Sequence, residues 1–351
     1  MTTSPMLIDT TPAGLAGLIA ASVAADIPLM VWGHAGLGKS RIIEQCAAQH
    51  ALAYCDFRAM ILDVPDLNGM PVINDMREGM PAPMTAPTGL PGRDAGPTLV
   101  CIEELPGAAR SMQGSLYGLI LERRLNGYSL PAGSRIVATG NLPDSGGVTQ
   151  VMPDPLINRF MHVRLVCTPD EHLAYAQATG WHPITIGYHA MTKGTEWDSF
   201  GPAQKRQGIA FASPRSWEAM SRVLNSGALP ADCIGQACAG ILGEAVGAKF
   251  AAFVGLYASL QPTLDAMRTD PTTCPIPKDA ASHWFLASLL AEQLTPYDAE
   301  QWGIALLMRL SDEPTLWAMD AACKRDITIA RTVAFGQFAA IPRYAALARF
   351  V

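Results

Sequence analysis

The sequence predicts a three-layer α/β domain with a parallel sheet, followed by a region made of helices. Three observations support this fold class. Short apolar runs alternate with helical patterns between Ile27 and Val166, as they do when helices cover both faces of a parallel sheet. A glycine-rich loop, from Gly33 to Ser40, joins the first run to a helical pattern. After Cys167 the strand signals fade and helical periodicity continues.

Five apolar runs are the predicted strands, and each is short enough to be a buried strand of a parallel sheet. They cover residues 29–32, 53–57, 98–102, 135–139 and 162–166. Helices are predicted at 40–50 and 112–123. Residues 68–97 differ because they are rich in glycine, proline and methionine, and we expect a hairpin there around Asn74 and Asp75.

The glycine-rich loop matches the pattern G-x-x-x-x-G-K-[ST] in full. It consists of Gly33, His34, Ala35, Gly36, Leu37, Gly38, Lys39 and Ser40. Glycines let the backbone turn its N–H groups inward, and the start of the following helix adds partial positive charge. We expect Lys39 to reach the β- and γ-phosphates of a nucleotide and the Ser40 hydroxyl to bind Mg²⁺. The alternative is a glycine-rich connector with a chance lysine.

Two adjacent carboxylates follow the third predicted strand, in the stretch LVCIEEL. The strand delivers Glu103 and Glu104 to its carboxyl end, where ligands bind in open α/β sheets. We expect Glu103 to act on Mg²⁺ through water and Glu104 to polarise the attacking water. The alternative is a buried strand with a solvated, charged end.

Three further polar residues occupy positions from which they could contact phosphate. Asn141 follows the fourth strand and could hydrogen-bond the γ-phosphate or the lytic water, although asparagine after glycine is also a common turn residue. Arg159 lies just before the fifth strand, in LINRF. Arg215 lies in the first turn of a predicted helix, where the helix dipole disfavours a cation. We therefore expect Arg215 to face an anion, the alternative being a surface arginine.

Beyond residue 167 the sequence predicts helices alone. Ser213 is a good N-cap and Pro214 suits the first helical position, and residues 237–260 are predicted to form one long helix. Further amphipathic patterns cover 280–293, 298–310 and 316–324. The predicted organisation is an α/β domain at 1–167 with an insert at about 68–84, a helical lid at 168–262 and a helical C-terminal extension at 263–351.

Composition limits the classes of function. Hydrophobic residues make up 49% of the 351 residues and charged residues 16%, which suits a well-packed globular protein. The net charge is −6 and no long basic run is present, which disfavours tight binding to duplex nucleic acid. The N-terminus has no positively charged n-region, and the apolar stretch before Asp26 is too short to span a bilayer. We therefore expect a cytoplasmic protein without a membrane partner.

The eight cysteines form no C-x-x-C pair, which favours reduced thiols in a cytosolic protein. A metal site could in principle be assembled from one cysteine and three histidines in the middle of the chain. Their spacing matches no zinc pattern; the residues are Cys167, His172, His182 and His189.

Taken in order, GHAGLGKS, DLNG, LVCIEEL, TGN, LINRF and SPR resemble the motifs of AAA+ ATPases of the MoxR family. The resemblance covers roughly residues 29–260. Within it, DVPDLNG precedes the place of the family's helix-2 insert, and RRLNGYSLPAGSRIVATGN resembles the pre-sensor-1 hairpin. It implies a P-loop AAA+ three-layer parallel-sheet domain followed by an all-α lid; the helical C-terminal extension is not covered.

The resemblance also implies a role for each site residue. Residues 33–40 would be Walker A, Glu103 and Glu104 Walker B, Asn141 sensor 1, Arg159 the arginine finger and Arg215 sensor 2. The sequence departs from the family at Glu103, where aspartate is usual. The extra methylene, about 1.5 Å of chain, pushes the carboxylate deeper toward Mg²⁺, which affects hydrolysis more than nucleotide binding.

The function implied by this resemblance is an ATPase that uses ATP and Mg²⁺, forms a homo-oligomeric ring, expected to be a hexamer, and remodels or activates a protein client. Family members often act with a partner that carries a von Willebrand factor A domain. Two alternatives stay open: a slowly hydrolysing nucleotide switch that serves as a scaffold, and a nucleic-acid motor, which the lack of a basic tract disfavours. The methionines of the insert suit adaptable contacts with a pore or client, the alternative being a gap-filling loop; they are Met70, Met76, Met80 and Met84.

Overall fold

The computed structural model describes residues 7–72, 84–142, 150–199 and 210–350. Two compact units make up this part of the chain: one contains the described residues up to Thr168, and the other those from Pro169 onward. Each unit is described by itself below. No helix among the described residues has both the length and the apolar character needed to cross a bilayer.

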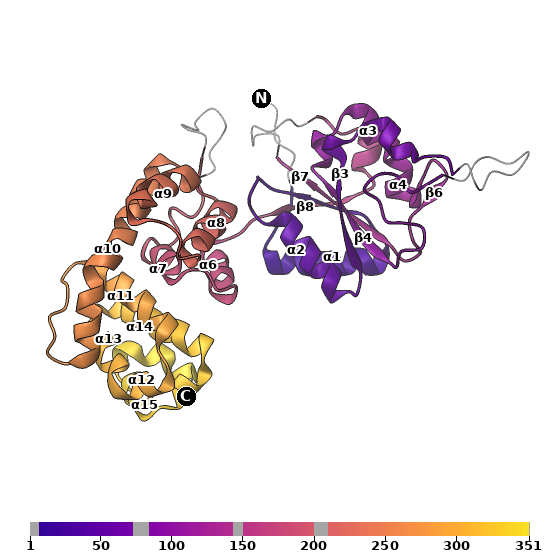
Figure 1. The fold of residues 1–351 in the computed structure, drawn as a ribbon. Coiled ribbons are helices and arrows are strands. Elements are labelled where there is room, and N and C mark those ends of the chain that lie inside the picture. The colour runs from indigo at the N-terminus through magenta and orange to yellow at the C-terminus, as the bar shows by residue number, and fades with distance from the viewer. Residues whose placement is uncertain (1–6, 73–83, 143–149, 200–209, 351) are drawn as a thin grey trace, which may run out of the picture. The chain divides into compact units, whose positions relative to one another are not determined.

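A six-stranded parallel sheet forms the centre of the first unit (Figure 1). Its strands are β1 (Asp9–Thr10), β2 (Leu29–Trp32), β3 (Ala53–Arg58), β4 (Thr98–Glu103), β7 (Arg135–Gly140) and β8 (Met161–Leu165). They lie in the order β1-β8-β2-β7-β4-β3, and every pair is parallel. All five predicted strands are confirmed to within a residue at each end. The sixth, β1, is too short to give a sequence pattern.

Helices cover both faces of this sheet, as the fold-class prediction requires (Figure 1). On one face lie α1 (Pro12–Ala25) and α2 (Lys39–Gln49), which contact each other. On the other face α3 (Arg110–Ser115) and α4 (Tyr117–Glu122) form a core with apolar side chains of the strands. The helix predicted at 112–123 is therefore two short helices, interrupted at Leu116.

Two antiparallel pairings lie outside the main sheet of the first unit. Strands β5 (Arg124–Leu125) and β6 (Tyr128–Ser129) pair antiparallel around Asn126 and Gly127, both of which have positive φ, as a tight hairpin turn requires. Near the predicted insert, Pro71 and Met84 form an antiparallel bridge. The predicted turn at Asn74 and Asp75, with Met76 and Met80, lies outside the described residues.

The second unit is helical, with one hydrophobic core running through it. Its helices are α6 (Pro169–Ala178), α7 (Pro183–Met191), α8 (Pro214–Asn225), α9 (Ile234–Leu242), α10 (Glu244–Thr269), α11 (Ala280–Gln293), α12 (Pro296–Asp298), α13 (Ile304–Leu307), α14 (Asp312–Arg325) and α15 (Val333–Ala339). The predicted start of α8 is confirmed, because the Ser213 hydroxyl accepts the Ser216 N–H at 3.3 Å.

The single helix predicted at 237–260 is wrong, because the chain turns at Gly243 between α9 and α10. Gly243 has φ 85°, and a Cβ there would lie 2.7 Å from the Ala210 carbonyl oxygen. The predicted lid–extension boundary at 262/263 also falls inside α10, and the structure does not divide the chain there. The core continues across it; for example, the rings of Phe253 and Phe285 lie 5.7 Å apart. Helical periodicity shows which residues are helical, but not which helices pack together.

Candidate nucleotide-binding and active site

The glycine-rich loop connects the end of β2 to the start of α2. The Gly33 N–H donates to the Gly140 carbonyl at 3.1 Å, which attaches the loop to the end of β7. Gly36 and Gly38 have φ of 88° and 85°, a conformation that costs glycine little and other residues more. Gly38 is the N-cap of α2 and supplies no side-chain cap. The first-turn N–H groups of an 11-residue helix are thus left for an anion.

Lys39 is buried at the mouth of this loop, with 9% of its surface exposed. Its ammonium group donates to the carbonyls of Gly33 at 2.6 Å and His34 at 3.0 Å, and to Asn141 Oδ1 at 3.3 Å. These three neutral oxygens help to hold the lysine in place. A phosphate oxygen carries more negative charge than any of them and would be a stronger acceptor for the same group.

The two carboxylates lie at the end of β4. Glu103 is half-buried and accepts two hydrogen bonds: Oε2 from the Thr139 hydroxyl at 2.6 Å, and Oε1 from the Cys101 thiol at 3.3 Å. Burial and the neighbouring Glu103 charge raise the pKa of the Cys101 thiol well above its usual value. The thiol therefore stays protonated and can donate this hydrogen bond to Glu103. Glu104 is exposed and adopts the left-handed conformation, with φ 52°, which is uncommon outside glycine.

Asn141 joins the lysine to the second carboxylate. Its Oδ1 accepts from Lys39, and its Nδ2 donates to Glu104 Oε1 in a longer contact of 3.4 Å. The preceding residue must be small, because a Cβ on Gly140 would lie 2.8 Å from Cγ of the rigid Pro106 ring. The structure thus brings together four residues that the sequence predicted from three separate motifs.

Thr139 was not predicted, although it touches both glutamates. Besides donating to Glu103, its hydroxyl accepts the Glu104 backbone N–H at 3.1 Å. The signal for it was present in the sequence: a single hydroxyl within the apolar run RIVATG, two residues before Asn141.

The two predicted arginines are on other elements of the chain. Arg159 stacks on the ring of Tyr117, with its Cζ 4.1 Å from the ring centroid, and donates to the Tyr117 hydroxyl at 2.7 Å and to the Pro155 carbonyl. None of these partners belongs to the cluster around Lys39. Arg215 is exposed on α8, in the second unit. Its predicted role as sensor 2 stays a prediction.

The oxygen donors present at this site suit Mg²⁺. Ser40, the second residue of α2, offers a hydroxyl and Glu103 a carboxylate, and Mg²⁺ in proteins commonly binds one or two such groups together with phosphate oxygens and water. Within the described ranges, no three His, Cys, Asp or Glu side chains gather as they would in an all-protein metal site. Phosphate and water would therefore complete the coordination.

Of the residues considered for a zinc site, only two histidines are brought together. The rings of His172 and His189 lie 5.1 Å apart, edge to face, with Trp181 and Trp217 beside them. Burial lowers the pKa of His172 to about 4 and that of His189 well below its usual value. The His182 ring accepts the Ile184 N–H, and the Cys167 thiol donates to the Thr168 carbonyl. Tryptophans, not further ligands, surround the histidine pair.

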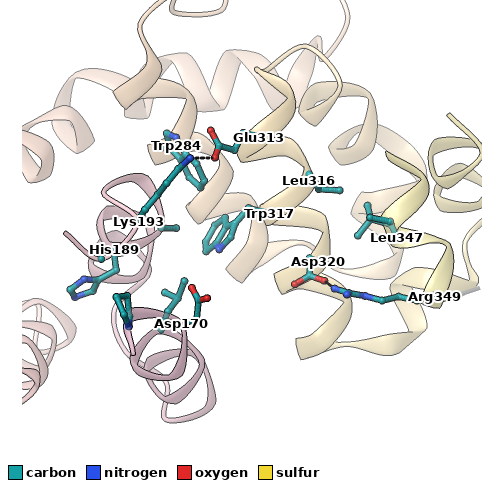
Figure 2. Close-up of a pocket in the computed structure, with 15 residues that line it drawn as sticks. Asp170, His189, Lys193, Trp284, Glu313, Leu316, Trp317, Asp320, Leu347 and Arg349 are labelled. Carbon is teal, nitrogen blue, oxygen red and sulfur yellow. Dashed lines mark hydrogen bonds and ion pairs between the residues drawn. The ribbon is translucent and has the colours of Figure 1, made fainter. Parts of the chain in front are cut away.

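The second unit also contains a cavity of about 570 Å³ that the sequence did not predict. Figure 2 shows Lys193 and Glu313, whose charged groups lie 2.8 Å apart at its edge, with Trp284 and Trp317 nearby. Arg349 pairs with Asp320 on another side. Most of the charges around the cavity thus neutralise one another, and none of the predicted nucleotide-site residues lines it.

No family model matches the chain, and no curated protein matches it. Among solved structures it is similar to a candidate ATPase from Cytophaga hutchinsonii (14% identity, 88% of this chain and 79% of the other, TM-score 0.36). It is also similar to a lysine-to-arginine mutant of RuvB from Thermotoga maritima (12%, 67% and 66%, TM-score 0.37). A third is NtrX from Brucella abortus in complex with ADP (13%, 96% and 67%, TM-score 0.39).

The fold class is assigned from the chain itself. The five long strands, numbered along the sequence, lie in the spatial order 5-1-4-3-2, with the glycine-rich loop after the first strand and the carboxylates after the third. This is the P-loop AAA+ three-layer parallel-sheet fold, followed by a helical C-terminal part.

Proposed function

We propose that this chain is a Mg²⁺-dependent ATPase of the AAA+ class and of MoxR type. The observation that carries the proposal is the contact of one amide, that of Asn141, with both Lys39 and Glu104. It links a phosphate-binding cation to a carboxylate positioned to polarise water. Lys39 is itself the first residue of α2, and the uncapped start of this helix offers N–H donors to the same phosphates.

In the proposed reaction each of these residues has a distinct task. The loop N–H groups and Lys39 bind the β- and γ-phosphates, with Lys39 exchanging its carbonyl partners for phosphate oxygens. Mg²⁺, when bound, neutralises charge on the phosphates. Glu104 orients and polarises the attacking water, and Asn141 holds that water or the γ-phosphate in line. Arg159 of a neighbouring subunit supplies the positive charge that the transition state needs.

The finer assignment, to a MoxR-type ring that remodels or activates a protein client, rests on the order of the motifs. Two structural features support it: the β5–β6 hairpin before β7, and the antiparallel bridge between Pro71 and Met84 at the position of the insert. A hexamer and a partner with a von Willebrand factor A domain belong to the same proposal.

Turnover and nucleotide binding test the proposal directly. The purified chain should hydrolyse ATP, and Lys39→Ala should abolish both tight nucleotide binding and hydrolysis. Glu104→Gln keeps the size and hydrogen-bonding capacity of the side chain but not its charge, so it should retain ATP and turn it over at least about 100-fold more slowly. Parent-like turnover by Glu104→Gln would show that Glu104 is not the base. Because Glu104→Gln would retain ATP, it is also the form to use for capturing a client.

The nucleotide switch is the second candidate, and Glu103 favours it. The Glu103 side chain is longer than aspartate, and both of its carboxylate oxygens already accept hydrogen bonds, from Cys101 and Thr139 of the sheet. This arrangement could hold Mg²⁺ and the water in positions that allow ATP binding but only slow hydrolysis. Steady hydrolysis well above that of Lys39→Ala would remove this reading. A nucleic-acid motor is disfavoured by the net charge of −6, and unchanged hydrolysis on adding DNA or RNA would exclude it.

A further inference from the structure

One buried hydroxyl joins the two glutamates of the nucleotide site. Thr139 lies on β7 with none of its surface exposed. Its Oγ1 donates to Glu103 Oε2 at 2.6 Å and accepts the Glu104 N–H at 3.1 Å. A hydroxyl has one proton to donate and lone pairs to accept, so these two bonds use it in both directions at once.

The geometry points to Thr139 as a positioning residue that aligns Glu103 and Glu104 for the Mg²⁺–nucleotide reaction. The inference rests on the proposed function and adds a residue to it. Thr139 itself touches neither phosphate nor water in this assignment; it acts through the carboxylate of Glu103 and the backbone turn at Glu104.

Each of the two glutamates has a reason to need such an anchor. Glu103 carries one more rotatable bond than aspartate, and its carboxylate can leave the site unless something fixes it. The hydroxyl of Thr139 holds one oxygen and the thiol of Cys101 the other, at 3.3 Å. Glu104 has a left-handed backbone, which is strained for a residue with a side chain, and the Thr139 hydroxyl holds its N–H in that turn.

Thr139 is also linked through the chain to Asn141, the other polar residue of the site. Thr139 is two residues before Asn141, which contacts both Lys39 and Glu104. Removing the hydroxyl therefore loosens the carboxylates while leaving the glycine-rich loop intact. The expected signature is a loss of Mg²⁺-dependent function with metal-free nucleotide binding preserved, which a purely structural role of the hydroxyl would not produce.

The experiment compares Thr139→Val and Thr139→Ser with the parent chain. Valine keeps the shape of the residue and removes the hydroxyl, whereas serine keeps the hydroxyl. Thr315→Val is the matched control, because Thr315 is also fully buried and its hydroxyl donates to the Leu307 carbonyl at 2.6 Å, in the second unit. For each variant, the dissociation constants of ADP and ATP are measured with Mg²⁺ and with EDTA, together with kcat and the melting temperature.

Thr139→Val should lower kcat by about 10- to 100-fold, the effect of losing one hydrogen bond to a charged group. It should also lose most of the gain in nucleotide affinity that Mg²⁺ gives the parent, with affinity in EDTA unchanged. Thr139→Ser should restore both properties. Thr315→Val should lower the melting temperature without altering the Mg²⁺ gain. If Thr139→Val does not fold, Thr139→Cys, which keeps a weaker donor, takes its place and should show a partial loss.

Parent-like kcat and parent-like Mg²⁺ gain in Thr139→Val would overturn the inference, as would a loss that serine does not restore. A parent chain that binds nucleotide without turning it over would remove hydrolysis from the proposed function, and the Mg²⁺ gain would still decide the role of Thr139. A parent chain that binds no nucleotide in either condition would overturn the proposed function and this inference together.

Discussion

At the end of the sheet, the first unit keeps a lysine and two glutamates in contact with hydrogen-bonding partners, whereas the second unit buries two histidines among tryptophans. In the first cluster Lys39 donates to the oxygens of Gly33, His34 and Asn141, and Glu103 accepts from Thr139 and Cys101. In the second, both ring nitrogens of His189 and Nε2 of His172 lack a hydrogen-bond partner in the described part of the chain.

The difference shows two ways of burying polar groups. The carboxyl ends of parallel strands lie together at one edge of a sheet and place their backbone and side-chain polar groups there. Charged residues at this edge can therefore be stabilised by partners from several strands. Packed helices satisfy their own backbone and offer few such partners. A histidine among them is buried in its neutral form, which burial favours by lowering its pKa.

The largest expected effect tests whether Arg159 of a neighbouring subunit completes the charged cluster around Lys39. Lys39→Ala and Arg159→Ala should each lower hydrolysis by about 10³-fold or more. The first removes the cation that binds the β- and γ-phosphates, and the second removes the arginine finger that stabilises charge on the transferred phosphate. Arg159→Ala should still bind ATP. Equal mixing with subunit exchange should restore activity, because about a quarter of the head-to-tail interfaces would then carry an intact loop facing an intact finger. The measurement is ATP turnover of the mixture against each variant alone.

Arg124→Ala, at an exposed arginine of β5, is the control and should behave like the parent. An Arg159→Ala variant that remains active on its own would show that the finger is another residue. If exchange is demonstrated and activity does not return, either the finger lies elsewhere or neighbouring sites must act together.

A smaller effect is expected from breaking the amide contact inside the cluster. Asn141→Ala should lower kcat by about 10- to 100-fold with little change in ATP affinity, because it removes contacts to Lys39 and Glu104 but leaves the loop in place. Asn141→Asp should lower kcat further, since a new carboxylate would repel Glu104. Steady-state kinetics and ATP binding measure the two quantities separately.

Asn225→Ala, at an exposed asparagine at the end of α8, is the matched control for these variants. Equal kcat in Asn141→Ala and Asn225→Ala would mean that the amide contact has no part in catalysis. The proposal for Asn141 would then have to be withdrawn, while the assignments of Lys39 and Glu104 would stand on their own tests.

The smallest expected effect comes from the histidine cluster. Burial holds the pKa of His172 at about 4, below the unfolded value of about 6.5. The unfolded chain therefore takes up a proton first as the pH falls. This histidine costs no stability above pH 6.5, and the cost grows between pH 6.5 and 4. Between pH 7 and 5 it should lower the free energy of unfolding by about 2 kcal/mol.

Denaturant unfolding at several pH values measures this slope. His172→Phe, which keeps an aromatic ring among the tryptophans, should reduce this slope and leave the part that buried His189 contributes. His50→Phe, at an exposed histidine, should leave the slope unchanged. A slope in His172→Phe equal to that of the parent would mean that His172 is not the group responsible. The histidine cluster of the helical unit would then not be the source of the loss of stability at low pH.

The sequence by itself determined what depends on neighbouring residues in the chain. The strands, the glycine-rich loop and the start of α8 could be predicted because apolar periodicity, glycine and a capping serine act within a few residues. That Asn141 lies near both Lys39 and Glu104 could be anticipated as well, since the ends of parallel strands meet at one edge of the sheet.

Only the tertiary structure decided what depends on residues far apart in the sequence. The Thr139 hydroxyl meets Glu103 36 residues away, and Arg159 meets Tyr117 42 residues away. The turn at Gly243 depends on its approach to Ala210, and the shared core of the helical unit depends on which helix faces pack together. A linear pattern records that a side chain is polar or apolar. Its partner is set by the packing of elements that the chain brings together only when it folds.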